Sequence, residues 1–226
     1  MEKKFWEARW QSEEIGFHLP SVHPLLKEYL PTMALDENAT LFLPLCGKTL
    51  DIAYLLSLEY QVVGVELSER AVEQLFLSLQ VTPEIQAWAG GKVWRAQGLT
   101  VFQGDVFALT PNDIGAVDAI YDRAALVALP EGMRQQYASH LVELTYAAPQ
   151  LLISFEYQQS KMDGPPFSVE MAKIADMYAD LYELIELSWT NILEKFDKGR
   201  ASGLEEFIEV AWRLVPQQAR TLIGEE

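Results

Sequence analysis

The chain has 226 residues, half of them hydrophobic, which is enough to build a large α/β domain and excludes a disordered protein. Its 33 acidic and 17 basic side chains give a formal net charge of −16, which disfavours nucleic acid or an anionic membrane surface as the main partner. The N-terminus lacks an apolar signal segment, and no run of about 18 apolar residues is present. We therefore expect a cytoplasmic protein that binds neither nucleic acid nor membrane.

Cysteine and histidine usage disfavours a metal centre. Cys46 is the one cysteine of the chain, so it has no second thiol with which to form an internal disulfide. The three histidines, His18, His23 and His140, show no ligand spacing. We expect no bound metal ion.

The order of the predicted elements favours an α/β fold. Residues 1–35 predict helical pieces over 3–14 and 21–30, the second ending at Pro31. The expected strands are 40–45, 61–66, 99–104, 116–121, 150–157, 181–190 and 205–215, and the expected helices are 49–59, 69–79, 131–146 and 168–179, with an irregular stretch at 81–98. This alternation predicts a mostly parallel sheet covered on both faces, with the last two strands forming an antiparallel edge hairpin. No repeat or linker divides the chain, so we expect one domain over 1–226, with 1–35 as an N-terminal segment and 36–226 as the core.

The stretch 41–66 carries the strongest functional signal. It predicts a buried strand, a tight turn at Gly47, an amphipathic helix and a second buried strand that ends at Glu66. In open α/β sheets ligands bind outside the carboxyl ends of the strands, and an acid about 20 residues after the turn accepts the ribose hydroxyls. Glu66 follows Gly47 by 19 residues. Its carboxylate is either this ribose acceptor or an acidic cap of the following helix.

The turn at residues 44–48, PLCGK, contains one glycine. A dinucleotide site uses a Gly-rich loop to bring a pyrophosphate against the helix N-terminus. A Walker-type phosphate loop needs a glycine where this chain has Phe42. Both are therefore disfavoured, and the turn fits an adenosine-like cofactor without a pyrophosphate. S-adenosylmethionine meets that description.

The strand 99–104 is followed by Asp105 and Val106. The Asp105 carboxylate is placed to accept from an adenine amino group, while the next backbone N–H serves a ring nitrogen. The alternative is a solvated turn residue.

The strand 116–121 is followed by Asp122 and Arg123. A cation at this edge of the sheet pairs either with the carboxylate of the cofactor or with an anionic nucleophile. The alternative is an internal ion pair of Arg123 with Asp122 or Glu66.

Five stretches together resemble the thiopurine S-methyltransferase family in its bacterial form, over nearly the whole chain. They are FWEARW…IGFH (5–18), LPLCGKTLD (43–51), VVGVELS (62–68), DRAALVALP (122–130) and DGPPF (163–167). The resemblance implies a doubly wound, Rossmann-like methyltransferase fold with a seven-stranded, mostly parallel sheet. It also implies a monomer that binds S-adenosylmethionine and methylates aromatic and heterocyclic thiols, thiopurines among them.

The resemblance assigns site residues as well. Those that contact the cofactor are Trp10, Leu45, Glu66, Asp105, Val106 and Arg123. Phe17 matches a substrate-contacting position, and a second substrate-side arginine maps loosely onto Arg200.

The expected chemistry is an in-line displacement that depends mainly on orientation. Aromatic thiols ionise readily near neutral pH, so we expect no strong general base. Cys46 has no sequence-evident base and is not expected to act as a nucleophile. The aromatics Trp6, Trp10 and Phe17 suit an N-terminal helical lid that excludes water, the alternative being simple packing onto the domain. Arg123 either favours the thiolate form of the substrate or holds the cofactor carboxylate.

Three other functions remain open at this stage. One is a methyltransferase for inorganic selenium or tellurium species. Another is a nicotinamide-dependent oxidoreductase, which the missing glycines disfavour, and the third is a non-catalytic adenosine-binding module.

Overall fold

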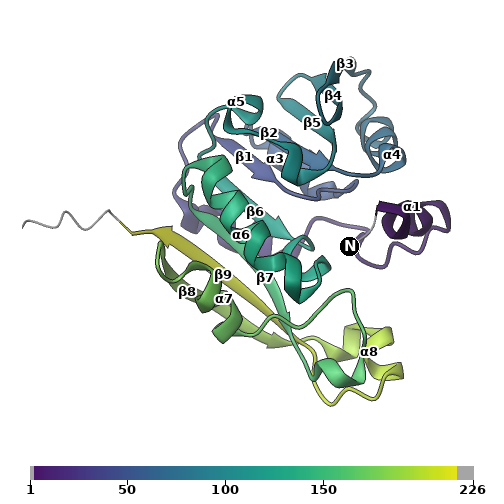
Figure 1. Ribbon diagram of the computed structural model, residues 1–226, viewed down its shortest axis with the longest axis vertical. Helices are drawn as coiled ribbons and strands as arrows, with labels where there is room; N and C mark the ends of the chain where they lie inside the picture. The colour runs from purple at the N-terminus through teal and green to yellow at the C-terminus, as the bar shows by residue number, and fades with distance from the viewer. Residues whose placement is uncertain (1–2, 218–226) are drawn as a thin grey trace, which may run out of the picture.

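The computed structural model describes residues 3–217 (Figure 1). The strands are β1 (Thr40–Leu43), β2 (Gln61–Glu66), β3 (Glu84–Trp88), β4 (Gly91–Ala96), β5 (Leu99–Gly104), β6 (Ala119–Arg123), β7 (Gln150–Glu156), β8 (Tyr182–Asn191) and β9 (Ile208–Pro216). The α-helices are α1 (Lys3–Gln11), α2 (Pro24–Tyr29), α3 (Leu50–Ser57), α4 (Glu69–Leu79), α5 (Pro111–Ile114), α6 (Glu131–Thr145), α7 (Met171–Tyr178) and α8 (Asp197–Ala201).

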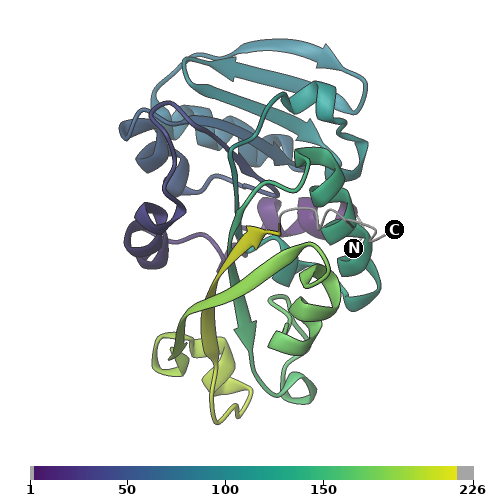
Figure 2. The same cartoon turned by 90° about the vertical axis from the view of Figure 1, so that its left-hand side faces the viewer.

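The described strands form one nine-stranded sheet in the order β3-β4-β5-β2-β1-β6-β7-β9-β8. Its centre, β5-β2-β1-β6-β7, is parallel. The hairpins β3–β4 and β8–β9 add antiparallel strands at the two edges. Figure 2 shows the β3–β4 hairpin at the top of the sheet and the β8–β9 pair at the bottom. The carboxyl ends of the five central strands therefore meet at one side, where ligands of such sheets bind.

Alternating side chains of the strands fill two hydrophobic layers. Phe42 and Val63 belong to a layer that α5, α6 and α7 cover. Leu41 and Val62, their immediate neighbours in β1 and β2, belong to a second layer that α2, α3 and α4 cover. Because successive side chains of a strand point to opposite faces, the sheet is covered on both sides, as the near-continuous apolar runs predict.

The helix over 69–79 begins and ends where the sequence predicts. The Ser68 hydroxyl accepts from the Ala71 N–H at 3.3 Å, which satisfies one of the free N–H groups of the first turn. Gln80 closes the helix in the left-handed conformation, with φ 57°.

The prediction of seven strands is wrong, because the described residues form a sheet of nine. All seven expected strands are present, two of them (61–66 and 99–104) with the predicted bounds and five with shifted ends, but the stretch 81–98 forms the hairpin β3–β4 instead of an irregular segment. Every residue of β3 except Trp88 is exposed, so this strand carries no alternation of buried and exposed residues that a sequence pattern would reveal. The α/β class and the antiparallel β8–β9 edge hairpin are confirmed.

Candidate functional site

The turn after β1 is bonded to the end of β2. The Cys46 N–H donates to the Val65 carbonyl at 3.0 Å, and the Gly47 N–H donates to Glu66 Oε2 at 2.9 Å. An added Cβ at Gly64 would lie 2.9 Å from Cys46 Sγ, so a glycine in β2 is what allows this close approach. The predicted pair of turn and acid is thus one bonded unit at the carboxyl edge of the sheet.

Glu66 is the buried acid of this unit, with 6% of its surface exposed. Its Oε1 accepts from the Ser68 N–H at 2.7 Å, and its Oε2 from the Gly47 N–H. Burial raises the pKa of the Glu66 carboxyl to about 6, and the backbone N–H donors oppose that rise. Ser68, not Glu66, caps α4 by accepting from the first turn of the helix. The cap function is therefore already filled, and Glu66 remains available for a ligand.

Leu45 and Gly47 define the shape of the turn. Both adopt positive φ angles, 48° and 55° respectively. For leucine this conformation is strained, and strained backbone tends to persist at functional sites because the surrounding contacts hold it. The Leu45 side chain is partly buried against the layer that contains Phe42.

Cys46 does not have the properties of a nucleophile. It is 8% exposed, and burial together with the nearby Glu66 carboxylate raises the pKa of its thiol well above the usual value. A reactive cysteine needs the opposite setting, electropositive and open to solvent. The expectation that Cys46 is structural agrees with this geometry.

The N-terminal segment places aromatic rings directly on the turn. Trp10 is 3% exposed, and its Cζ2 lies 3.2 Å from the position that a Cβ on Gly47 would occupy. The ring of Phe17 meets Trp10 edge-on at 5.5 Å and Trp6 at 5.8 Å, measured between ring centroids. The Lys48 ammonium lies 5.9 Å from the Trp10 ring centroid. In Figure 1, α1 stands clear of the two layers of helices, on the same side as α4 and α8.

Arg123 joins the same N-terminal segment to β6. Its Nη1 donates to the Phe17 carbonyl at 2.7 Å. Within residues 3–217 it forms no ion pair with Asp122 or Glu66, because the Asp122 carboxylate accepts from Leu126 and Tyr137 instead. The internal ion pair that the sequence left open is absent from the described part of the chain.

Two residues near the turn had no assigned role in the sequence analysis. Lys48 donates to Gln74 Oε1 at 2.8 Å. The pKa of His18 is lowered by burial first, and then by the charges of Lys48 and Arg123. His18 is therefore neutral near pH 7. The sequence signal for His18 was its position next to Phe17, because a residue adjacent to a predicted site residue lies close to the same site.

Asp105 and Val106 follow β5 and begin a short 3-10 turn, Val106–Ala108. The exposed Asp105 carboxylate accepts from the Phe107 N–H at 3.1 Å through Oδ1. Val106 is buried, and its carbonyl accepts from His140 Nε2 at 2.8 Å. The N–H of Val106 opens the turn and so has no acceptor within it. Both the turn role and the adenine role predicted for Asp105 are compatible with this arrangement.

Arg200 lies on α8, away from the turn. Its guanidinium donates to the Glu194 carbonyl at 2.6 Å and contacts Asp197 of its own helix. The structure does not bring Arg200 into contact with Phe17, the other predicted substrate residue, so its substrate role stays a prediction.

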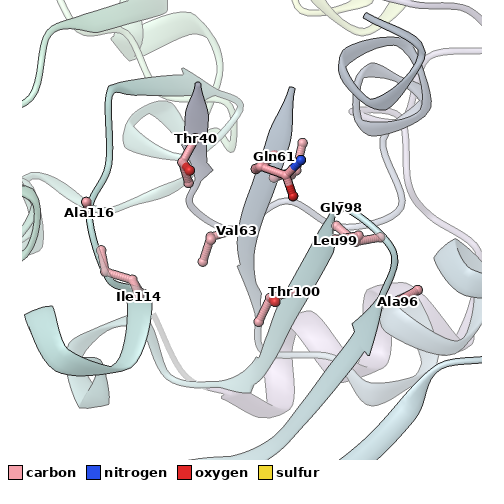
Figure 3. A pocket seen from close by; sticks show the side chains of 10 residues that line it. Thr40, Gln61, Val63, Ala96, Gly98, Leu99, Thr100, Ile114 and Ala116 are labelled. Carbon is pink, nitrogen blue, oxygen red and sulfur yellow. The ribbon is translucent and has the colours of Figure 1, made fainter. Parts of the chain in front are cut away.

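Two hollows in the described part of the chain lie at opposite edges of the sheet. The larger, about 460 Å³, lies at the amino ends of β1, β2 and β5, the edge opposite the predicted site (Figure 3). It is lined by Thr40, Gln61, Val62, Val63, Ala96, Gly98, Leu99, Thr100, Ile114 and Ala116, with no charged side chain among them. The smaller, about 320 Å³, is lined by Glu7, Gln11, Ser68, Arg70 and Glu73, between α1 and α4. The smaller hollow adjoins the buried acid through Ser68, so it is the one associated with the turn.

Residues 3–217 contain no group of three or more His, Cys, Asp or Glu side chains that could hold a metal ion. In the same part of the chain no helix is both long and apolar enough to span a bilayer.

Solved structures of similar shape define the class of fold. An S-adenosylmethionine-dependent methyltransferase from Anabaena variabilis aligns with a TM-score of 0.60 at 13% identity, covering 95% of both chains. A 1,6-didemethyltoxoflavin-N1-methyltransferase from Burkholderia thailandensis, solved with S-adenosylhomocysteine, aligns with a TM-score of 0.61 at 13% identity, covering 94% of this chain and 87% of that one. The fold is the Rossmann-like fold of S-adenosylmethionine-dependent methyltransferases.

Sequence comparison identifies the family. The family model for thiopurine S-methyltransferase matches residues 1–217. A thiopurine S-methyltransferase from Xanthobacter autotrophicus is 46% identical over 215 residues, covering 95% of this chain and 99% of that protein. One from Teredinibacter turnerae is 42% identical over 217 residues, covering 95% and 97%. The chain belongs to the thiopurine S-methyltransferase family.

Proposed function

We propose that this enzyme transfers the methyl group of S-adenosylmethionine to the sulfur of small aromatic or heterocyclic thiols, thiopurines among them. The observation that carries the proposal is the buried Glu66 carboxylate, bonded to a glycine-poor turn at the carboxyl edge of the sheet. Family membership supports the same activity. It disfavours the nicotinamide-dependent oxidoreductase.

The residues around the turn fit an adenosyl cofactor. Each oxygen of a carboxylate accepts two hydrogen bonds, and each oxygen of Glu66 is bonded to one N–H here. One further acceptor position per oxygen matches the two adjacent hydroxyls of a ribose. The turn itself has no Gly-rich loop for a pyrophosphate, which agrees with a cofactor that lacks one.

The other cofactor contacts follow from the same edge of the sheet. Asp105 and the N–H of Val106 would serve the adenine, and Leu45 and Trp10 would enclose the part of the cofactor near the sulfur. Arg123 would pair with the cofactor carboxylate, because its guanidinium already reaches from β6 to the segment above the turn.

The cofactor supplies an electrophilic methyl group on a positively charged sulfur. The residues of the chain orient the two reactants and exclude water. Trp10 and Phe17 cover the turn, and an aromatic face beside a cation contributes about 0.5–2 kcal/mol. A thiolate and a sulfonium become neutral in the reaction, so a dry site favours the transition state over the solvated ions.

We infer no strong general base. Aromatic thiols ionise near neutral pH without help, and the Lys48 ammonium lies where it would favour the anionic form. Phe17 is proposed to contact the substrate ring. Arg200 is proposed as a second substrate contact that would need α8 to approach α1.

We further propose that the chain works as one methyltransferase domain over 1–226, with 1–35 as a helical lid segment and 36–226 as the core. A monomer and a cytoplasmic location are part of the same proposal. Size-exclusion chromatography and cell fractionation test these two points.

The activity is tested in two steps. First, thermal unfolding is followed with S-adenosylmethionine, S-adenosylhomocysteine, NAD and ATP, because a ligand raises the melting temperature of the state that it binds. Stabilisation by the two sulfur cofactors alone supports the proposal. Second, formation of S-adenosylhomocysteine is measured with 6-mercaptopurine, thiophenol and, as competing acceptors, selenite and tellurite. Turnover with the oxyanions but not with the thiols would overturn the proposed acceptor class.

A further inference from the structure

Asp122 is a buried carboxylate that the proposed reaction does not use. It is 0% exposed, in β6, directly before Arg123. Its Oδ1 accepts from the Leu126 N–H at 3.0 Å, and its Oδ2 accepts from the Tyr137 hydroxyl at 2.7 Å. Burying an acid is costly unless donors satisfy it, so a fixed function is expected of a carboxylate kept in such a place.

The bonds of Asp122 fasten the backbone that carries Arg123. Successive side chains of a strand point to opposite faces of the sheet. Asp122 therefore points toward α6, and Arg123 points to the opposite face. The bond to Leu126 closes the turn that follows Arg123, in which Ala124 has a φ of 60°. The bond to Tyr137 ties the same turn to α6.

We propose that Asp122 is a positioning residue that holds the end of β6 so that the Arg123 guanidinium meets the cofactor carboxylate and the Phe17 carbonyl. The inference rests on the proposed role of Arg123. Asp122 touches neither reactant, and its effect passes through the orientation of one side chain. If Asp122 served folding alone, its substitution would weaken cofactor binding equally with and without the Arg123 side chain.

The test is a double-mutant cycle on S-adenosylhomocysteine affinity, measured by isothermal titration calorimetry with Asp122→Asn, Arg123→Gln and the double variant. Loss of a charge-assisted bond in Arg123→Gln is expected to weaken binding by about 10- to 100-fold. Asp122→Asn is expected to weaken it about tenfold alone and less than twofold in the Arg123→Gln background.

Two further variants separate positioning from stability. Tyr137→Phe removes one donor to Asp122 and is expected to weaken binding about threefold, and it remains informative if Asp122→Asn does not fold. Tyr182→Phe removes a matched buried bond to the Ala148 carbonyl, 3.0 Å long, near the amino end of β7. This control is expected to lower the melting temperature and leave the affinity unchanged.

Steady-state kinetics give the second readout. The KM for S-adenosylmethionine is expected to rise in Asp122→Asn and Tyr137→Phe while kcat stays within about twofold, because the contact lies away from the transferred methyl group. An equal loss of affinity from Asp122→Asn with and without Arg123 would overturn the inference, as would unchanged affinity in both single Asp122 and Tyr137 variants. Unchanged affinity in Arg123→Gln would instead overturn the proposed role of Arg123.

Discussion

Glu66 and Asp122 are two buried acids in β2 and β6, the strands on either side of β1, and they have different surroundings. Burial raises the pKa of each to about 6, and N–H or O–H donors partly offset the effect. Asp122 accepts from Leu126, in the turn that follows β6, and from Tyr137 of α6. Glu66 accepts from the Gly47 N–H of the turn and from the Ser68 N–H at the start of α4, and Trp10 covers the turn at Gly47. The two carboxyls have similar pKa values. The positions of their hydrogen-bond donors distinguish Glu66, the proposed ribose acceptor, from Asp122, the proposed positioning residue.

Removing the Glu66 carboxylate is expected to weaken S-adenosylhomocysteine binding by about 100-fold in Glu66→Ala, because two hydrogen bonds to a charged acceptor are lost. Glu66→Gln keeps the shape of the side chain but replaces one acceptor oxygen by a donor, and is expected to lose nearly as much. Calorimetric titration measures both, with circular dichroism as the control for folding. Unchanged affinity in the two variants would remove the ribose role from Glu66.

The affinity is also expected to depend on pH. The Glu66 carboxyl, with its pKa of about 6, is largely protonated at pH 5 and ionised at pH 7. Only the ionised form offers an acceptor oxygen to both ribose hydroxyls, because protonation turns one oxygen into a donor, so binding releases a proton below pH 6. Affinity for S-adenosylhomocysteine should therefore fall about tenfold from pH 7 to pH 5. In Glu66→Gln the fall should be smaller, and the part that remains is expected from Asp122, whose carboxyl also has a pKa of about 6. A fall in Glu66→Gln as steep as in the unchanged enzyme would contradict the role of Glu66.

At the residue level, the sequence predicted that the turn and Glu66 lie together, but not all of the bonds around them. The spacing of Gly47 and Glu66 predicted their meeting, and the structure joins them by a hydrogen bond. The partner of Arg123 was not predictable, because the Phe17 carbonyl is a backbone group more than 100 residues away and carries no sequence signal. The hydrogen bond between Asp122 and Tyr137 was not predictable either, because nothing in the sequence pairs these two residues.

At the level of elements, α1 differs from the helices that build the core. Trp10 is buried, yet it belongs to none of the three hydrophobic clusters formed by the described residues. The chain is anchored behind it at His23, whose N–H donates to Asp51 at 2.8 Å and whose ring contacts Glu209 at 3.2 Å. The segment before His23 can thus be removed without cutting this anchor.

Deleting residues 1–18 is expected to reduce kcat by at least tenfold and to shift the melting temperature by only a few degrees, since the segment covers the site but adds little to the core. Trp10→Ala should reproduce part of the loss. Differential scanning calorimetry and the methyl-transfer assay measure the two effects. A truncated enzyme with full turnover would show that the segment is not a lid.

The β3–β4 hairpin shows why one element escaped prediction. The residues Ala89 and Gly90 form its two-residue connection, and Ala-Gly is not one of the pairs, such as Asn-Gly or Asp-Gly, that indicate a tight hairpin turn. The alternation expected of a half-buried strand is missing from β3, because β3 is an edge strand whose side chains are mostly exposed. The central strands, buried on both sides, were predicted correctly because their apolar runs are nearly continuous.

For the whole molecule, the net charge of −16 is the main source of long-range electrostatic repulsion. A strong excess of one sign repels itself and destabilises the folded state, and salt screens this repulsion. Lys48 and Arg123 place positive charge beside the turn in a chain with an excess of negative charge.

Raising NaCl from about 20 to 300 mM is expected to raise the melting temperature by about 2–5 °C, with little further gain at higher salt once the Debye length is short. Thermal unfolding without ligand measures it. Potassium chloride serves as the control, since screening does not depend on the cation. A melting temperature that falls or stays level would show that favourable ion pairs outweigh the repulsion.

A crystal structure of the enzyme with S-adenosylhomocysteine would show whether Glu66 binds the ribose. We expect the two ribose hydroxyls within about 2.5–3.0 Å of the Glu66 carboxylate, the adenine beside Val106 and the ligand carboxylate on Arg123. A ligand seated in the hollow at the amino ends of the strands, or one that leaves Glu66 without a hydroxyl partner, would contradict it.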